Sequence, residues 1–398
     1  MATYLEKARE IPVTGSYDTV VVGGGFAGVS AALAAARGGN KVLLCERMFM
    51  LGGLGTAGLI TIYLPLCDGK GHQISFGIAD ELLRLSISHG SELVYGKAWL
   101  EGGSFEEKCK GRFKVRYNAS VCAILMEQLL LKNGVEILYG TTVCDVAMDN
   151  EVITHLVIEN KSGRSAVAAG NVIDCSGDAD VCVYAGEETA LYGPGNGLAA
   201  WYYFTNKDGF QLSPVGVKDT PESENTEEMY VRETFKFAGV DAKEISEIMQ
   251  ISHKTTLEHF LGRGEVSQFN MLGNIATIPQ LRMTRRLCGV TTQDCIDRER
   301  FEDSVGLYSD WRVSGPVYEL PYSALYGKKI KNLAVAGRCI SVTDEMWDVT
   351  RVIPVCAVSG EAVGTAAAMN KNFSEVDITH LQEKLRKNGV KLHFEECL

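Results

Sequence analysis

Residues 19–47 read TVVVGGGFAGVSAALAAARGGNKVLLCER, and this stretch decides the fold of the chain. A β-branched run enters a glycine turn, an alanine-rich helix follows, and a second apolar run ends on Glu46. Gly23, Gly25 and Gly28 have the spacing G-x-G-x-x-G, which brings a pyrophosphate close to the backbone and to a helix N-terminus. An acid after the second strand accepts hydrogen bonds from a ribose diol. Because all these parts occur in order, the stretch predicts a dinucleotide site rather than a chance glycine turn.

Composition and charge exclude several classes of protein. The chain has 398 residues, of which 46% are hydrophobic and 22% charged, as in ordinary globular enzymes with room for two domains. A net charge of −11 argues against a general binder of nucleic acid or of anionic membranes. No apolar run is long enough to span a bilayer, and residues 1–10 do not resemble a secretory signal. We therefore expect a cytoplasmic protein.

The cysteines do not indicate a metal site. There are twelve, but no two are separated by two residues, so the spacing excludes both a zinc site and a redox dithiol. Buried or half-buried thiols in a reducing compartment explain them better. We expect no bound metal.

Periodicity and turn residues predict the remaining elements. We expect helices at 77–89, 117–132, 241–259 and 358–369, and strands at 135–139, 141–147, 152–159, 165–174, 200–204 and 332–336. Residues from about 191 to 326 differ in character, with aromatic strands and an acidic segment at 218–228, which indicates an insertion. The chain then returns to the nucleotide fold, an order typical of flavoproteins rather than of plain NAD dehydrogenases.

Several motifs together resemble a known family. They are GGGFAG with Glu46-Arg47, the loop 52–56, DCSGDAD at 174–180, LRMTRR at 281–286, and the block from NLAVAGRCIS to TRVIPVCAVSGEAVGTAAAM. The chain resembles the FAD-dependent oxidoreductases related to the fumarate reductase and succinate dehydrogenase flavoproteins, within the glutathione-reductase-like FAD fold. The resemblance implies an α/β fold: a Rossmann-like FAD-binding domain with a central parallel sheet and a β-meander, plus an inserted mixed α+β substrate domain. The expected FAD domain comprises 1–60, 110–190 and 328–398, and the insertion comprises 61–109 and 191–327.

The resemblance also implies which residues hold the cofactor. Glycines approach the pyrophosphate, Glu46 holds the ribose, and a strand backbone meets the adenine. The last helix is expected to open with 360–365 beneath the flavin, where its dipole would stabilise the reduced ring. The implied FAD contacts are Gly23, Gly25, Phe26, Ala27, Gly28, Glu46, Arg47, Gly53, Leu54, Thr56, Val143, Gly177, Asp178, Gly337, Arg338, Gly360, Val363 and Gly364.

Simpler explanations remain for some of these residues, since the glycines at 52–53 fit any loop and Asp178 fits a helix cap. No histidine lies between Glu46 and Gly71, where related flavoproteins attach FAD covalently, so we expect a non-covalent FAD.

Three arginines are the candidate catalytic residues. If 281–286 is a strand, Arg282 and Arg286 share a face while Arg285 points the other way, and the planar guanidinium suits carboxylate recognition. The alternative is a set of structural salt bridges. Arg351 lies just before the expected flavin helix and is the third candidate.

The sequence thus predicts an FAD-dependent oxidoreductase that transfers a hydride between a small organic substrate and flavin N5. The substrate and the electron acceptor stay open, and a homo-oligomer is allowed. The alternatives are an electron-transfer flavoprotein subunit with a protein partner, an NAD-dependent dehydrogenase and a nucleotide-dependent methyltransferase. The first lacks cysteine spacing for an iron–sulfur cluster, and the third lacks the late return segment.

Overall fold

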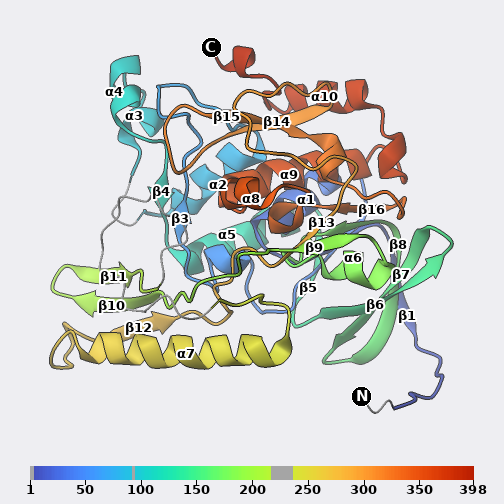
Figure 1. Cartoon of the computed structure of the whole chain (residues 1–398), viewed down its shortest axis with the longest axis horizontal. Helices are drawn as coiled ribbons and strands as arrows, with labels where there is room; N and C mark the ends of the chain where they lie inside the picture. The colour runs from blue at the N-terminus through green and yellow to red at the C-terminus, as the bar shows by residue number, and fades with distance from the viewer. Residues whose placement is uncertain (1–3, 92–94, 217–235) are drawn as a thin grey trace.

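A mostly parallel sheet forms the centre of the computed structural model, which describes residues 4–91, 95–216 and 236–398 (Figure 1). The sheet has seven strands in the order β5-β2-β1-β8-β7-β6, and β16 also pairs with β8. The strands are β1 (Val13–Val22), β2 (Val42–Cys45), β5 (Glu136–Leu138), β6 (Thr142–Asp149), β7 (Val152–Asn160), β8 (Gly163–Asp174) and β16 (Leu333–Val335).

The register of the parallel strands makes them end at one edge. Val22 of β1 lies opposite both Cys45 of β2 and Asp174 of β8, and Asp174 lies opposite Val335 of β16. The apolar runs of these strands are buried, as parallel strands covered on both faces require. The residues that follow each strand, Gly23 among them, therefore meet at the carboxyl edge of the sheet, where ligands bind in open α/β folds.

The β-meander lies beside this parallel part. β6, β7 and the first half of β8 pair antiparallel, and Asn150 makes the β6–β7 turn with a φ of +53°. The expected α/β fold with a parallel sheet and a β-meander is thus confirmed. The strand pairing predicted from 141–147 and 152–159 is also present.

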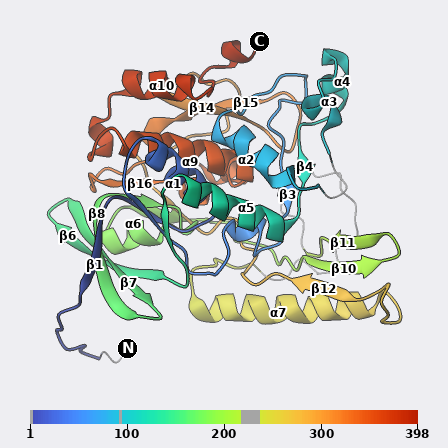
Figure 2. The ribbon, with the colours of Figure 1, turned by 180° about the vertical axis from the view of Figure 1, so that it is seen from behind.

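Helices cover the sheet. Figure 2 shows α1, α2, α5 and α9 close together near the middle of the molecule, beside the sheet. The helices are α1 (Phe26–Arg37), α2 (Ile78–Ile87), α3 (Lys97–Leu100), α4 (Phe105–Lys110), α5 (Ala119–Lys132), α6 (Asp180–Ala185), α7 (Ala242–Leu261), α8 (Asp344–Thr350), α9 (Ile353–Ala367) and α10 (Ile378–Lys387). None of these described helices is both long and apolar enough to cross a bilayer.

The helix α9 begins earlier than the sequence pattern predicted. We expected a start near 358, but the helix starts at Ile353, with Pro354 in its first turn. Proline suits that place because its missing N–H would have no partner there and its φ already fits a helix. The other predicted helices lie close to their expected bounds: Asp241 caps α7, and its carboxylate accepts from the backbone N–H groups of Lys243 and Glu244.

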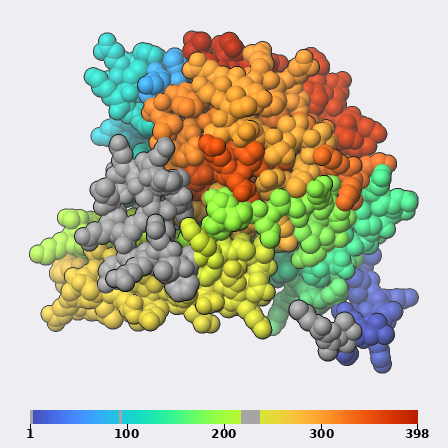
Figure 3. Space-filling view, viewed as in Figure 1, coloured from blue at the N-terminus to red at the C-terminus, as the bar shows by residue number. Residues whose placement is uncertain are grey.

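Residues of the expected insertion build a smaller layer. β10 (Tyr202–Asn206) pairs with β11 (Gly209–Ser213) and β12 (Leu272–Ile275), and α7 packs on this sheet. In Figure 3 the yellow and gold residues of this layer form a lobe below the orange residues of the main body. The short pairs are β3 (Ile62–Tyr63) with β4 (Val115–Arg116), β9 (Thr189–Leu191) with β13 (Arg285–Leu287), and β14 (Ser304–Ser309) with β15 (Val317–Pro321).

Packing bears on the expected domain division, which stays a prediction. Leu82 of α2 and Tyr308 of β14 belong to the main core, although both lie in the expected insertion. Tyr202 and Phe260 belong to a small hydrophobic cluster that is separate from the main core, and Leu198 and Leu281 belong to another. The acidic segment 218–228 lies outside the described residues.

Candidate functional site

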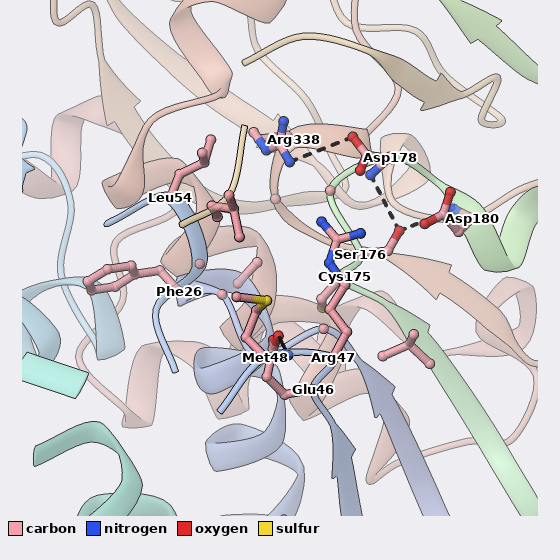
Figure 4. Close-up of a pocket in the computed structure, with 18 of the residues that line it drawn as sticks. Phe26, Glu46, Arg47, Met48, Leu54, Cys175, Ser176, Asp178, Asp180 and Arg338 are labelled. Carbon is pink, nitrogen blue, oxygen red and sulfur yellow. Dashed lines mark hydrogen bonds and ion pairs between the residues drawn. The ribbon is translucent and has the colours of Figure 1, made fainter. Parts of the chain in front are cut away.

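A deep cavity opens at the carboxyl edge of the sheet (Figure 4). Its volume is about 560 Å³, within the roughly 300–1,000 Å³ typical of ligand and cofactor sites. Its walls come from the turn after β1, the residues after β2, the loop 52–55, the start of β6, the segment 175–181, residues 277–281, the turn after β16 and the start of α9. The opening turn and the last long helix of the nucleotide fold therefore border one continuous space.

The three motif glycines serve different purposes. Gly23 has a φ of +99°, and a Cβ there would lie 2.4 Å from the carbonyl oxygen of Cys175. A Cβ on Gly28 would lie 1.8 Å from the carbonyl oxygen of Gly23, so this glycine lets α1 pack on the turn. A Cβ on Gly25 would meet no described atom within 4 Å. Gly25 therefore borders open space in the cavity, as expected where a pyrophosphate approaches the backbone.

The loop after β2 lies against this turn. The N–H of Gly52 donates to the carbonyl oxygen of Gly24 (2.7 Å), and a Cβ on Gly53 would meet only the Cα of Gly25, at 3.4 Å. Together Gly25 and Gly53 leave a groove that side chains would fill. Leu54 also lines it. Thr56, however, is buried away from the described lining and donates to the carbonyl oxygen of Leu51, so its expected cofactor contact is not seen.

Glu46 is fixed at the other side of the turn. Its Oε2 accepts from the N–H of Gly24 (2.6 Å) and its Oε1 from the N–H of Met48 (2.7 Å). The side chain is buried, yet it lines the cavity, as do Arg47 and Val143. A carboxylate has lone pairs beyond these two bonds, so Glu46 can still accept from a diol. This end of the cavity fits the nucleoside part of a dinucleotide.

Asp174 organises the opposite wall, and the sequence analysis missed its role. Its Oδ1 accepts from the N–H and Oγ of Ser176, and its Oδ2 accepts from the N–H groups of Val181 and Cys182 at the start of α6. Burial raises the pKa of this carboxyl, and these hydrogen bonds oppose the rise. Since Asp174 satisfies the start of α6, Asp178 is not the cap of that helix.

Asp178 instead faces the cavity and two other segments. Its Oδ1 accepts from Oγ1 of Thr284 (2.6 Å) and lies 3.7 Å from Nη2 of Arg338. Figure 4 shows this pair above Ser176, across the cavity from Phe26 and Leu54. A Cβ on Gly177 would lie 2.3 Å from Nη2 of Arg338, so the glycine makes room for the guanidinium. Gly177, Asp178, Gly337 and Arg338 all line the cavity as expected.

The start of α9 borders the far end. Ile353 and Cys356 line the cavity, and Val352 is the N-cap of the helix. Gly360, Val363 and Gly364 lie in the buried interior of the helix and outside the described lining, so the structure does not bring these expected contact residues to the cavity. A Cβ on Gly360 or Gly364 would lie 2.3 Å from a carbonyl oxygen of α1. The two glycines hold α9 against α1.

The three candidate arginines lie in different places. Arg351 lines the cavity, and its Nε and Nη2 both contact Oδ1 of Asp348, at 2.8 and 2.7 Å. Arg282 and Arg286 lie outside the described lining, with their guanidinium groups over the rings of Trp201 and Trp347, at 5.6 and 5.9 Å from the ring centroids.

Arg282 also precedes β13, so the face that we expected it to share with Arg286 does not exist. The structure thus brings only one of the three candidates to the cavity. The sequence feature that pointed to Arg351 was its position just before the expected flavin helix.

Segment 277–286 carries contacts that the sequence analysis missed. Thr277, Ile278, Pro279 and Leu281 line the cavity, as do Gly239 and Ile245 from the inserted layer. Nε of Arg285 donates to the carbonyl oxygen of Asp178 (2.8 Å), and its Nη2 lies 2.8 Å from Oδ1 of Asp180. The sequence signal was the motif LRMTRR at 281–286, which does not reveal which of its side chains contact the segment after β8.

Burial also sets the protonation of the acids and thiols. It raises the pKa of Asp180 to about 6, with the charges of Asp178 and Asp174 adding to the rise and Arg285 and Arg47 opposing it. Burial raises the pKa of Cys356 to about 12, so the thiol at the cavity wall is neutral near pH 7. The neutral thiol is a poorer nucleophile than a thiolate.

Comparisons with known proteins bear on the family of the chain. A family model described as FAD dependent oxidoreductase matches residues 18–197 and 200–385. A thioredoxin reductase from Ureaplasma parvum serovar 3 is 27% identical over 237 residues, which cover 56% of this chain and 66% of that protein. The family match spans most of the chain and is the finding that bears on function.

Two solved structures are also similar to the chain. A geranylgeranyl bacteriochlorophyll reductase-like protein from Thermoplasma acidophilum is 15% identical with a TM-score of 0.48, covering 94% of this chain and 83% of that one. The 3-ketosteroid-Δ4-(5α)-dehydrogenase from Rhodococcus jostii RHA1 is 14% identical with a TM-score of 0.43, covering 90% of this chain and 98% of that one.

Proposed function

The chain belongs to the FAD dependent oxidoreductase family and uses FAD, and we propose that it transfers a hydride between a small organic substrate and N5 of that flavin. The continuity of the cavity carries this proposal. One space joins Glu46 and the Gly25 turn to Arg351 and the start of α9. Because its lining residues come from both of these regions, it can receive an extended dinucleotide whose reactive end lies away from the adenine. Bound flavin supplies the hydride chemistry, and the protein supplies orientation and electrostatics.

The proposed placement follows from the chemistry of the walls. Gly25 and Ala27, at the start of α1, would receive the pyrophosphate, because free N–H groups and the helix dipole favour an anion there. Glu46 would hold the adenosine ribose. Asp178 and Arg338 would face the ribityl chain from the other wall. The isoalloxazine would then lie against Ile353, where the positive end of the α9 dipole favours electron density on the ring.

Arg351 is the proposed substrate-facing cation. Asp348 fixes its guanidinium from one side, and the ring of Trp311 lies 5.3 Å away. Arg312 lies 3.6 Å from the other oxygen of Asp348, so the acid is shared between two arginines and cannot serve as an unencumbered base. A guanidinium held in this way suits a carboxylate or a carbonyl oxygen of the substrate.

The alternatives have weaker support. The similarity to a thioredoxin reductase suggests dithiol chemistry, but the sequence has no C-x-x-C pair and all twelve cysteines are free. An electron-transfer subunit would need a second redox partner, and an NAD-dependent dehydrogenase would place a nicotinamide in the cavity. Neither alternative explains the presence of Arg351 in the cavity lining as well as a small substrate does.

Anaerobic reduction of the bound flavin tests the proposal. The FAD-loaded protein is mixed with a panel of carboxylic acids, alcohols, amines and enones, and the flavin absorbance band is followed. Bleaching by at least one small molecule, without a protein partner, is the expected result. Reduction that occurs only with a protein donor would support the electron-transfer alternative instead.

A further inference from the structure

Residues 277–286, called the strap, run along one wall of the cavity. The strap begins just after β12 and includes the first two residues of β13, Arg285 and Arg286. Thr277, Ile278, Pro279 and Leu281 line the cavity. The strap touches three segments that border the cofactor site, and each contact is made by named polar groups.

The first anchor joins the strap to the loop after β2. The N–H of Thr277 donates to the carbonyl oxygen of Ala57 (2.9 Å), and Nε2 of Gln280 donates to the carbonyl oxygen of Gly58 (2.6 Å). Gln280 is buried, so its hydrogen bond is shielded from water. This anchor holds the strap near the groove of Gly25 and Gly53.

The second anchor is Arg338. Its Nη1 donates to the carbonyl oxygens of Leu281 and Arg282, at 2.9 and 3.2 Å. The same guanidinium approaches Asp178 through Nη2. Arg338 therefore contacts the strap and the opposite wall at once, from the turn after β16.

The third anchor joins the strap to the segment after β8. Oγ1 of Thr284 donates to Asp178, and Arg285 contacts both the carbonyl oxygen of Asp178 and the carboxylate of Asp180. Arg285 thus uses two sides of its planar fork on two residues of the loop. Asp178 and Asp180 line the cavity, where they would repel an anionic pyrophosphate if their charges were unopposed.

We propose that Arg285 is a positioning residue that locks the strap over the cofactor and thereby controls how tightly FAD is bound. The inference rests on the proposed placement of FAD in this cavity. Arg285 lies outside the lining, so it acts through Asp178, Asp180 and the strap rather than by contact with FAD. Its side chain is 20% exposed, and a hydrogen-bonded ion pair with this shielding is stronger than a fully exposed one.

The test compares Arg285→Met with Arg164→Met as a matched control. Arg164 pairs with Glu159 on the meander at 2.8 Å and is 27% exposed, but it lies outside the described cavity lining. FAD is titrated into each apo-protein and its fluorescence gives the dissociation constant, while urea unfolding of the apo-protein reports stability. R285M should raise the dissociation constant about tenfold, as the loss of a charged hydrogen bond implies. R164M should bind FAD as the wild type does.

A second variant keeps the test decisive if R285M does not fold. Arg285→Lys keeps the charge beside Asp180 but cannot make both bonds, so it should bind FAD several-fold more weakly than the wild type while folding normally. Wild-type FAD affinity in R285K, or equal affinities in R285M and R164M, would overturn the role of Arg285. A wild-type protein that binds no FAD would instead overturn the proposed function.

Discussion

At the scale of single residues, Gly25 and Gly28 have opposite surroundings: open space lies beside Gly25, and backbone atoms lie against Gly28. Alanine at Gly25 would enter open cavity space, and the φ of −66° there suits any L residue. Alanine at Gly28 would place a Cβ 1.8 Å from the carbonyl oxygen of Gly23. The first glycine is therefore required by the ligand, and the second by the fold.

This contrast gives a paired prediction. G25A should change the free energy of unfolding of the apo-protein by less than about 0.5 kcal/mol and should weaken FAD binding at least tenfold. G28A should lower that free energy by about 1–3 kcal/mol, since an overpacked contact must force the backbone apart. Urea unfolding and FAD titration measure the two quantities. A G25A protein with wild-type FAD affinity would place the pyrophosphate elsewhere.

Glu361 is a buried acid whose protonation couples to folding. Its Oε2 accepts from the N–H of Ile78 at the start of α2 (2.7 Å). Burial raises the pKa of this carboxyl from 4.5 to about 8, and the charge of Glu81 adds to the rise. Because the folded-state pKa is the higher one, the stabilising contribution is complete below about pH 4.5 and is lost as the pH rises through about 8.

We therefore expect the free energy of unfolding to fall between pH 5 and 8 more steeply in the wild type than in Glu361→Gln. Glutamine keeps an acceptor for Ile78 and cannot ionise. The variant should therefore lose less unfolding free energy over this pH range than the wild type, by about 1.4 kcal/mol for each unit of the pKa shift. Denaturation in urea at a series of pH values measures both profiles. Parallel profiles would show that Glu361 is ionised throughout.

At the scale of elements, the contact between α1 and α9 places both ends of the cavity. Gly360 lies against the carbonyl oxygen of Ala27 and Gly364 against that of Ala31, so backbones touch where side chains usually intervene. Ala27 lines the cavity at one end of this contact, and Ile353 lines it at the other. The helix pair therefore fixes the distance between the two regions that the proposal assigns to pyrophosphate and flavin.

Alanine at either glycine should separate the helices. G360A and G364A are each expected to lower the free energy of unfolding by about 1–3 kcal/mol. G360A should also weaken FAD binding, because its added methyl group pushes on Ala27, whereas G364A acts one turn further from the cavity. The ratio of FAD dissociation constants for the two variants measures this difference. Equal constants would mean that the helix contact does not position the cofactor.

The same elements show what the sequence could predict. Local signals placed the glycine turn, Glu46 and the meander, because each depends on residues close together in the chain. The start of α9 was misplaced because its small residues obscure the periodicity, although Pro354 marked the first turn. Gly360 was assigned to the cofactor because a glycine in a flavoprotein motif does not reveal whether a ligand or a second helix lies against it.

At the scale of the whole molecule, contacts between distant segments decided what the sequence could not. Thr284 contacts Asp178 and Arg338 contacts Leu281 because residues 281–284 lie at the carboxyl edge of the sheet, far in sequence from both partners. The spacing within 281–286 favoured Arg282 and Arg286, because these two side chains would share one face if the segment were a strand. Arg285, the side chain that was expected to point away, is the one that contacts Asp178 and Asp180.

We expect the turn after β1 and the start of α9 to hold opposite ends of one FAD molecule. The most direct test is a crystal structure of the chain saturated with FAD. We predict density for the pyrophosphate against Gly25 and Ala27 and for the isoalloxazine against Ile353 and Arg351, with the strap closed over both. Density for FAD outside this cavity, or a flavin ring at the Glu46 end, would show that the turn after β1 and the start of α9 do not hold FAD in this way.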